Sequence, residues 1–206
     1  MIIELVGPPC SGKSTLAQML EKEHGFTRIK IKNNFELVFL NMFFIIKYPI
    51  FSIETFFLIM KESKTIRLFY YKFTNIFLHH NARYEKAKQF EHAVIDEGLT
   101  HNILSIFEKP LLDKDVLSYL KKIPLVDKVL LFRTNKKTLY ERASRRGYLA
   151  RENFLNKNEQ EEWFSSILKN TETLIKNSSL IGNACIIDGN KSGEEIKTEA
   201  LSFLQM

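Results

Sequence analysis

Short apolar runs, separated by longer helix-forming stretches, set the pattern of the chain. Four runs are rich in aliphatic or β-branched residues, at 1–6, 92–95, 126–132 and 184–187. Runs of this length are typical of strands buried in a parallel sheet. Residues 26–31 alternate between apolar and basic positions, which predicts a further strand. Strands that alternate with helices in this way predict an α/β fold, a three-layer arrangement of about five parallel strands with helices on both faces.

Helix-forming segments fill the intervals between these runs. Gly25 is suited to end the first helix, and Pro124 stops the helix that precedes the fourth strand. Ser192 and Glu195 have the spacing of a capping box, so they predict the start of the last helix. The other expected helices lie at 14–24, 99–107, 113–122, 135–146 and 152–178.

Residues 35–91 are expected to be almost wholly helical. This block contains no glycine, and we expect breaks near Pro49 and Ser52 and again near Asn81. Asn33 and Asn34 precede it and can cap its first helix. A long helical block between two strands of the sheet is an insertion that can enclose a substrate.

The first part of this block is rich in Phe and Ile, but polar residues interrupt it repeatedly. No apolar stretch exceeds the length of Met42–Ile46, far short of the ~18–20 residues that span a bilayer. We therefore expect buried helix faces and no membrane span. The alternative is a membrane-facing or lipid-binding surface. The interrupting residues are Glu36, Asn41, Lys47, Pro49 and Glu54.

The composition is that of a globular protein. The 206 residues are 45% hydrophobic and 26% charged, so we expect a single domain over 1–206 with a sizeable core. The net charge is +6, but the chain has no block of Lys and Arg of the kind found in nucleic-acid-binding tails. We therefore expect no nucleic-acid partner, although the positive charge suits nucleic acid as well as an anionic ligand such as ATP. A basic nucleic-acid-processing role stays as an alternative.

Cysteine usage and the N-terminal sequence suggest a cytoplasmic protein. Cys10 and Cys185 are the two cysteines of the chain, too few for a disulfide framework, and we expect free thiols in a reducing compartment. The N-terminus enters the first strand without a basic region or a cleavage site, so no signal peptide is expected.

A phosphate-binding motif follows the first strand and opens the first helix. It fits G-x-x-x-x-G-K-[ST], the P-loop, in the context that this motif requires. Backbone N–H groups of such a loop point at phosphate oxygens, and the helix N-terminus adds partial positive charge. Lys13 would neutralise the β- and γ-phosphates of ATP, and the Ser14 hydroxyl would bind Mg²⁺. The alternative is a chance match in an ordinary turn. The nucleotide-binding residues predicted here are Gly7, Pro8, Pro9, Cys10, Ser11, Gly12, Lys13, Ser14 and Thr15.

Two acidic residues end the strand at 92–95. Asp96 can hold Mg²⁺ beside a P-loop, directly or through water, or can accept a proton from a substrate hydroxyl. Glu97 follows it and is a candidate contact for the substrate. Which of the two is the base stays open. The alternative is that both only cap the helix that begins near Leu99.

Arginines follow the fourth strand at helical spacing. Arg142 and Arg146 lie four residues apart and share a face of the predicted helix, with Arg145 close to it. Arginines beyond the strand ends can clamp a transferred phosphoryl group and stabilise its charge in the transition state. The alternative is a solvated basic face. We expect a lid segment at about 139–152.

These motifs together resemble the nucleoside and nucleotide kinases of the P-loop superfamily, and most of all thymidylate kinases. The motifs that carry the resemblance are the P-loop, the Asp at the end of the third strand, Leu139-x-x-Arg142-x-x-x-Arg146-Gly147 with Arg151-Glu152, and Ile187-Asp188-Gly189 with Glu194-Glu195. The resemblance implies that Arg142 and Arg146 belong to a lid. It also implies that the loop with Asp188 and Gly189 lies beside the adenine of ATP, and that the helices after the second strand form the acceptor site.

The chain departs from thymidylate kinases at one important position. Those enzymes carry Asp-Arg after the third strand, and the arginine holds the acceptor phosphate, whereas this chain has Glu97. A carboxylate at that position favours a neutral hydroxyl compound over a monophosphate as acceptor. Arg67 or Arg83 of the helical block can supply the missing positive charge and contact the substrate.

The sequence therefore predicts a Mg²⁺- and ATP-dependent phosphotransferase that acts on a small-molecule acceptor, in the first place a nucleoside or nucleotide. Another hydroxylated compound, such as a sugar or an antibiotic, is an alternative acceptor. The alternative from another class is a P-loop NTPase that acts as a switch and binds a partner through 35–91. GTP is a less favoured donor, because the chain has no Asn-Lys-x-Asp motif. The oligomeric state stays open, with a homodimer among the alternatives.

Overall fold

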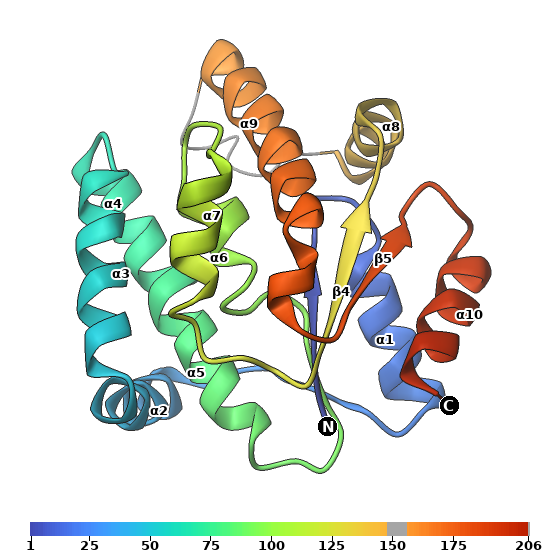
Figure 1. The fold of residues 1–206 in the computed structure, drawn as a ribbon, viewed down its shortest axis with the longest axis horizontal. Helices are drawn as coiled ribbons and strands as arrows, with labels where there is room; N and C mark the ends of the chain where they lie inside the picture. Colours follow the sequence, from blue (N-terminus) through green and yellow to red (C-terminus); the bar gives the residue numbers. More distant parts are fainter. Residues whose placement is uncertain (148–155, 206) are drawn as a thin grey trace.

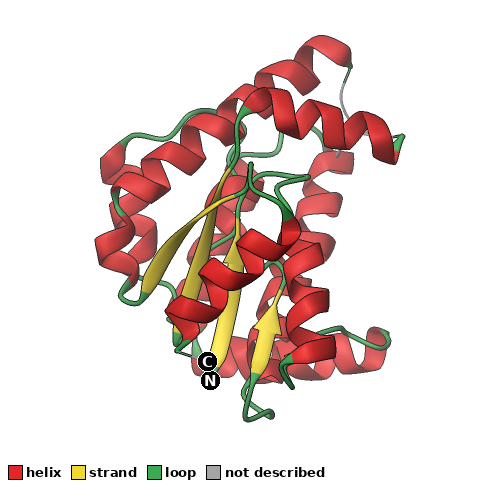
Figure 2. Ribbon diagram, turned by 90° about the vertical axis from the view of Figure 1, so that its right-hand side faces the viewer, coloured by secondary structure: helices red, strands yellow, loops and turns green. Residues whose placement is uncertain are grey.

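The computed structural model describes residues 1–147 and 156–205 and has a parallel sheet at its centre (Figure 2). The sheet has five strands in the order β2-β3-β1-β4-β5, and every neighbouring pair is parallel. The predicted α/β fold is therefore confirmed. The strands are β1 (Ile2–Val6), β2 (Thr27–Arg28), β3 (Ala93–Ile95), β4 (Lys128–Arg133) and β5 (Ala184–Asp188).

Helices cover both faces of this sheet (Figure 1). Ile3 and Leu5 of β1 pack with Leu16 and Ile196, which come from the helices of one face. Those helices are α1 (Lys13–Glu23) and α10 (Gly193–Leu204). The helices of the other face are α5 (His79–Ala87), α6 (Asn102–Ser105), α7 (Asp113–Leu120) and α9 (Lys157–Lys176).

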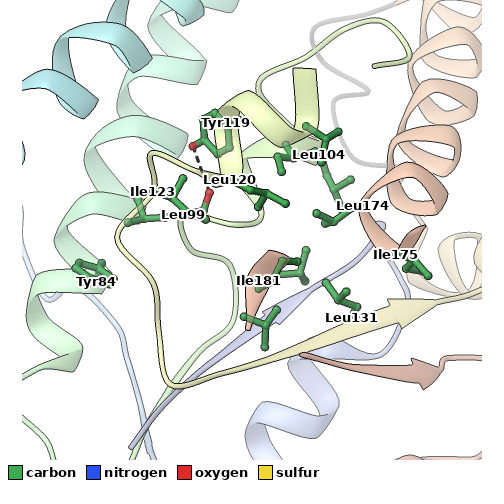
Figure 3. Packing of buried hydrophobic residues seen from close by; sticks show 14 of the residues in the cluster. Tyr84, Leu99, Leu104, Tyr119, Leu120, Ile123, Leu131, Leu174, Ile175 and Ile181 are labelled. Atoms are coloured by element: carbon green, nitrogen blue, oxygen red, sulfur yellow. Dashed lines mark hydrogen bonds between the residues drawn. The ribbon is translucent and has the colours of Figure 1, made fainter. Parts of the chain in front are cut away.

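The core on the second face joins β1 and β4 to α7 and α9. Leu131 of β4 packs in one cluster with Leu120 and Leu174, and the Tyr119 hydroxyl donates a hydrogen bond to the Leu99 carbonyl at 3.3 Å (Figure 3). Because successive residues of a strand face opposite sides, Val6 joins this cluster while Leu5 joins the other. The sheet is thus buried on both faces, as its apolar strands predict.

The carboxyl ends of the strands meet at one edge of the sheet, and α8 (Lys136–Arg146) lies beyond that edge (Figure 1). The register places Val6 beside Leu131 and Arg133 beside Asp188. This edge therefore collects the P-loop, the acids after β3, the start of α8 and the loop after β5. Ligands of open parallel sheets bind at such an edge.

The block after β2 is helical, as predicted. Its elements are α2 (Asn34–Lys47), α3 (Pro49–Lys61), α4 (Ile66–Lys72), the π-helical turn η1 (Phe73–Leu78) and α5. The Asn33 side chain caps α2 by accepting a hydrogen bond from the Glu36 amide at 2.9 Å. Pro49 begins α3, and the two helices are bent by 114° where they meet.

The break expected near Pro49 and Ser52 is found at Tyr48–Pro49, whereas the break expected near Asn81 is wrong. Ser52 lies inside α3 and Asn81 inside α5. The chain is interrupted instead at 62–65, where the Thr65 side chain accepts a hydrogen bond from the Leu68 amide and starts α4. The hydrogen bond from the Leu68 amide to the Thr65 side chain starts a new helix instead of continuing the previous one. Helix propensity alone did not indicate this break.

Two other elements are shorter than the sequence predicted. The strand expected at 26–31 is only Thr27–Arg28, an edge strand. The helix expected at 99–107 is reduced to Asn102–Ser105, because the His101 amide donates to the Glu4 carboxylate at 2.8 Å. A buried side chain of β1 thus takes a backbone donor of the turn before α6 and delays the helix.

No single helix among the described residues has the length and apolar character needed to cross a membrane. Within 1–147 and 156–205, α2 and α3 taken together are the one pair that reaches that length and composition, and they are bent by 114°.

Candidate active site

The P-loop connects β1 to α1 in a tight turn. Gly12 has φ +106° and Cys10 has φ +64°, both in the left-handed region. Gly7 sits against β4, so closely that a Cβ at this position would lie 2.6 Å from the Phe132 Cβ. Glycine is therefore required at Gly7 for packing and at Gly12 for backbone conformation. Both glycines of the motif thus have a structural reason that fits phosphate binding.

Lys13 begins α1 and folds back over this loop. Its Nζ donates to the Gly7 carbonyl at 2.8 Å and to the Pro8 carbonyl at 2.9 Å, and the side chain is 5% exposed. Burial lowers the pKa of Lys13, while the nearby Glu97 and Asp96 carboxylates raise it. An ammonium held this way is poised to meet an anion at the loop.

Asp96, predicted as metal ligand or base, lies beside an arginine of the edge strand. Its Oδ2 accepts a hydrogen bond from Arg28 Nη2 at 2.5 Å, and both side chains are largely buried. Its Oδ1 is buried and has no hydrogen-bond partner in the described structure. A buried carboxylate oxygen without a donor suits a cation ligand, so Asp96 fits Mg²⁺ together with the half-buried Ser14 at the start of α1.

Glu97 points to the P-loop lysine rather than to Arg28. Its Oε1 lies 4.0 Å from Lys13 Nζ and 3.7 Å from His101 Nε2. The side chain is 45% exposed, so it remains accessible beside the buried ammonium. The two adjacent acids thus have different surroundings, and Glu97 is the more accessible of the two.

A hollow of about 320 Å³ lies on this side of the P-loop. Arg83 of α5 lies in it and donates to the Glu97 carbonyl at 3.0 Å. Arg67, the other predicted substrate contact, is exposed on α4 and is not among the residues that line it in the described structure. The lining residues are Pro9, Tyr71, Asn75, Ile76, His79, His80, Arg83, Glu97, His101, Leu104, Ser105, Trp163 and Ile167.

The histidines of this hollow are held neutral. His80 Nδ1 lies 2.6 Å from the Asn102 Oδ1, and burial lowers the pKa of His80 to about 3. Burial, helped by Lys13 and Arg83, holds the pKa of His101 well below its ordinary value. The contact between His101 and Glu97 is therefore one between a neutral ring and a carboxylate.

A second hollow, of about 280 Å³, lies on the other side of the P-loop. The predicted clamp residues Arg142 and Arg146 line it together with Arg145. Arg142 Nη1 donates to the Cys10 carbonyl at 3.4 Å, and the charge of Arg146 lowers the pKa of Lys13. Three guanidinium groups thus lie beside the loop, as the helical spacing predicted. Arg151 and Glu152 lie outside the described residues.

The loop after β5 packs against the P-loop. A Cβ on Gly189 would lie 2.0 Å from the Thr134 Oγ1 and 3.0 Å from the Ser11 carbonyl oxygen, so only glycine fits there. The Asp188 carboxylate accepts hydrogen bonds from the backbone and side-chain nitrogens of Asn190 at 2.9 and 2.7 Å. Asp188 therefore shapes its own loop, and Gly189 brings that loop against the P-loop.

Glu4, which sequence reasoning did not single out, supports the loop that carries Glu97. It is 1% exposed, and Gly98, Thr100 and His101 hydrogen-bond to its carboxylate. Burial outweighs these bonds and raises the pKa of Glu4 to about 7. An acid in the middle of an apolar strand was the signal that could have indicated this role.

Another hollow, of about 670 Å³ and thus larger than these two, lies elsewhere. It is bordered by α3 and α7 and by residues such as Phe57 and Lys122, and it does not include the P-loop. The candidate site residues Lys13, Glu97 and Arg142 therefore lie near the two smaller hollows, and hollow size alone would not have pointed to them.

The comparisons with known proteins support the fold. No family model and no curated protein sequence matches the chain. Three solved structures of deoxyadenosine kinase from M. mycoides are similar to it over its whole length. The complex with dCMP and dCDP has a TM-score of 0.58 at 19% identity, and 100% of this chain and 99% of that chain are covered.

The other two structures agree with the first. The complex with dATP has a TM-score of 0.58 at 18% identity and covers 100% of both chains. The complex with dCTP has a TM-score of 0.56 at 18% identity and covers 100% of this chain and 99% of that chain. These likenesses do not confirm the finer resemblance to thymidylate kinases. At such identities they establish a shared architecture: the chain has the fold of a P-loop nucleoside kinase.

Proposed function

We propose that the protein is a Mg²⁺- and ATP-dependent phosphotransferase that transfers the γ-phosphoryl group to a hydroxyl of a nucleoside-class acceptor. One observation carries the proposal: the P-loop separates two hollows of different chemistry. Cys10 lines the hollow that contains the three arginines, while its neighbour Pro9 lines the hollow that contains Glu97. A donor on one side and an acceptor on the other would meet at Lys13.

The arginine-lined hollow suits the donor. Arg142, Arg145 and Arg146 line it beside Gly12, where the left-handed backbone begins α1 and directs amides toward an anion. Guanidinium groups bind phosphate oxygens in a bidentate manner and stabilise the charge of a transferring phosphoryl group. We assign the triphosphate to this side and to the P-loop.

The hollow with Glu97 suits the acceptor. The acceptor oxygen would attack the γ-phosphorus, the bond from that phosphorus to the bridging oxygen would break, and ADP would leave. Glu97 would take the proton of the acceptor hydroxyl, because its carboxylate is accessible whereas the Asp96 Oδ2 is bound to Arg28. Lys13, 4.0 Å from Glu97, would hold the phosphates close to that base.

Mg²⁺ fits this arrangement through Ser14 and Asp96. The buried Asp96 Oδ1 is free of hydrogen bonds in the described structure, and Arg28 fixes the orientation of the carboxylate. Mg²⁺ is usually held by one or two carboxylates together with phosphate oxygens and water. When bound, it would neutralise negative charge on the phosphates.

Charge in the acceptor hollow favours a neutral compound over a monophosphate. Both His80 and His101 are neutral, so Arg83 is the cation of this lining that opposes Glu97. A phosphate placed ~4 Å from Glu97 would meet a repulsion of about 4 kcal/mol per unit charge at an effective dielectric constant near 20. A nucleoside hydroxyl avoids this cost and can hydrogen-bond to the carboxylate.

The test is an acceptor panel at fixed MgATP, in which each nucleoside competes with its own 5′-monophosphate. We expect phosphorylation of a nucleoside, a higher kcat/KM for it than for its monophosphate, and loss of transfer in Glu97→Gln. A higher kcat/KM for the monophosphate than for its nucleoside would overturn the assignment of a neutral acceptor. If the protein hydrolyses ATP but phosphorylates no nucleoside, sugar or other small alcohol, the result would favour an NTPase switch.

A further inference from the structure

The outer surface of α2 and α3 is apolar, although the helices lie at the periphery of the molecule (Figure 1). Most of the exposed large apolar side chains of the described residues belong to these two helices. A patch of this kind marks a surface that something covers. The most exposed members are Phe35 at 80%, Ile50 at 74%, Ile46 at 73%, Val38 at 63%, Phe57 at 59% and Ile53 at 57%.

Both helices are apolar on the inner and the outer side. In α2, Leu37, Leu40 and Phe44 are buried, while Val38 and Ile46 on the opposite side are exposed. A helix that is apolar all round is normally covered on every side, in a protein core or by lipid. The inner side is covered by the rest of the chain, so the outer side requires a partner.

The exposed charges of the segment that contains this surface are mostly of one sign. The exposed charged residues between 32 and 67 are basic apart from Glu54, which pairs with Lys122 at 2.9 Å. The acid Glu36 is half-buried and pairs with Lys86 at 2.6 Å. The exposed basic residues are Lys32, Lys47, Lys61, Lys64 and Arg67.

This combination favours a lipid surface over a second copy of the chain. In a two-fold dimer the same patch meets itself, so the basic residues of one copy would approach the basic residues of the other. An anionic bilayer offers hydrocarbon to the apolar side chains and negative headgroups to the lysines. We propose that the surface formed by α2 and α3 docks on a membrane that contains anionic lipid.

The geometry of the helix pair suits binding in the plane of the membrane surface. The two helices are bent by 114° at Tyr48–Pro49, and neither alone can cross a bilayer. In Figure 1, α2 is seen nearly end-on at the lower left and α3 runs up the left edge, so both lie along one flank. Side chains such as Ile46 and Ile50 can then enter the interface while the sheet stays outside it.

The test is flotation of the full chain with phosphatidylcholine vesicles, with and without phosphatidylglycerol. We expect the wild-type protein to float with the mixed vesicles and to be released by high salt. Lys47→Glu with Lys64→Glu should lower partitioning onto mixed vesicles on the order of 10-fold or more and should change it little on neutral ones. Ile46→Asn with Ile50→Asn should lower it on the order of 10-fold on both.

Ile186→Asn is the matched control, because Ile186 is 41% exposed on β5, at the other edge of the sheet. Flotation of this variant should equal that of the wild type, with thermal melting as the check of folding for all variants. A wild-type protein that stays at the bottom with anionic vesicles overturns the proposal. Sedimentation velocity without lipid gives a second test. If the wild type is a dimer and the double variant Ile46→Asn, Ile50→Asn is a monomer, the proposal is overturned, because a second copy then covers the surface.

Discussion

The edge of the sheet and the helical block 34–87 differ in how their side chains face solvent. At the strand ends, charged groups have specific neighbours: Lys13 is buried, and Asp96 is largely buried beside Arg28. In the helical block, large apolar groups such as Ile46 and Phe57 are exposed. In the first region, packing of the sheet holds the charged groups in fixed positions. In the second region, apolar surface stays accessible for binding.

In the function that we propose, this difference separates the part of the molecule that carries the chemistry from the part that selects the acceptor. The strand ends are rigid because five strands fix them, so they can hold reacting groups in position. The helical block contributes Arg83, His79 and His80 to the hollow that we assign to the acceptor. We expect variants at the sheet edge to change phosphoryl transfer, and variants in the block to change acceptor binding or surface docking.

The largest effect is expected at Lys13. Lys13→Ala should lower transfer on the order of 10³-fold or more, because the ammonium neutralises phosphate charge in the transition state. Thermal melting should change little, since the hydrogen bonds of the ammonium go to carbonyls of its own loop and its contact with the half-exposed Glu97 is a long one, at 4.0 Å. Steady-state transfer measured beside melting is the check, with the exposed Lys22→Ala on the same helix as control. If Lys13→Ala transferred phosphate at the wild-type rate, the P-loop at the sheet edge would not take part in phosphoryl transfer.

Arg146 should come next. Arg146→Ala should lower kcat on the order of 10²-fold while the KM for ATP changes less, because the guanidinium engages charge that develops in the transition state. Lys137→Ala on the same helix is the control, since Lys137 is exposed and is not among the described residues of the donor hollow. An unchanged kcat would show that Arg146 takes no part in the transfer step, and would favour the alternative that the arginines of α8 form a solvated face.

The sequence predicted the sheet edge better than the block for a physical reason. Motifs such as Gly7 to Ser14 act through local backbone geometry, so their spacing carries the information. The contact between Arg28 and Asp96 joins residues far apart in the chain, and the hydrogen bonds of Glu4 shorten the helix expected after Leu99. Such long-range contacts override local propensity and leave no periodic pattern.

The sequence predicted that the block is helical, but it did not predict which side of each helix faces the rest of the protein. α2 and α3 are apolar on all sides, so periodicity could not tell which side of them is buried. Arg67 and Arg83 were equivalent candidates in the sequence, because only tertiary packing decides which of them reaches the hollow. The structure places Arg83 in that hollow and Arg67 on the surface.

Arg83 offers the test of the inner side of the block. Arg83→Ala should raise the KM for the acceptor on the order of 10-fold and leave the KM for ATP unchanged, because Arg83 lines the acceptor hollow and holds the Glu97 backbone. Arg67→Ala is the matched control and should leave both values as in the wild type. Equal effects of the two variants would show that the block contributes only stability.

The smallest effect on turnover, with a clear effect on stability, is expected at Glu4. Its pKa in the folded protein is about 7, against an ordinary value of 4.5, so the folded state binds this proton more tightly than the unfolded state does. Its contribution to stability is complete below about pH 4.5 and is lost as the pH rises through 7. A shift of this size corresponds to a loss on the order of 3 kcal/mol between those limits.

Glu4→Gln removes this titration while it keeps an oxygen that can accept the His101 amide. The difference in unfolding free energy between wild type and variant, measured by urea unfolding at pH 5 and at pH 8, should therefore shift in favour of the variant at the higher pH. Other titrating groups are shared by the two proteins and cancel in this difference. The kcat at pH 7 should stay within about threefold, because Glu4 supports the loop from behind and does not line the acceptor hollow in the described structure. A difference that does not depend on pH would mean that the carboxylate is ionised in both states, and that its hydrogen bonds to the loop outweigh the cost of burial.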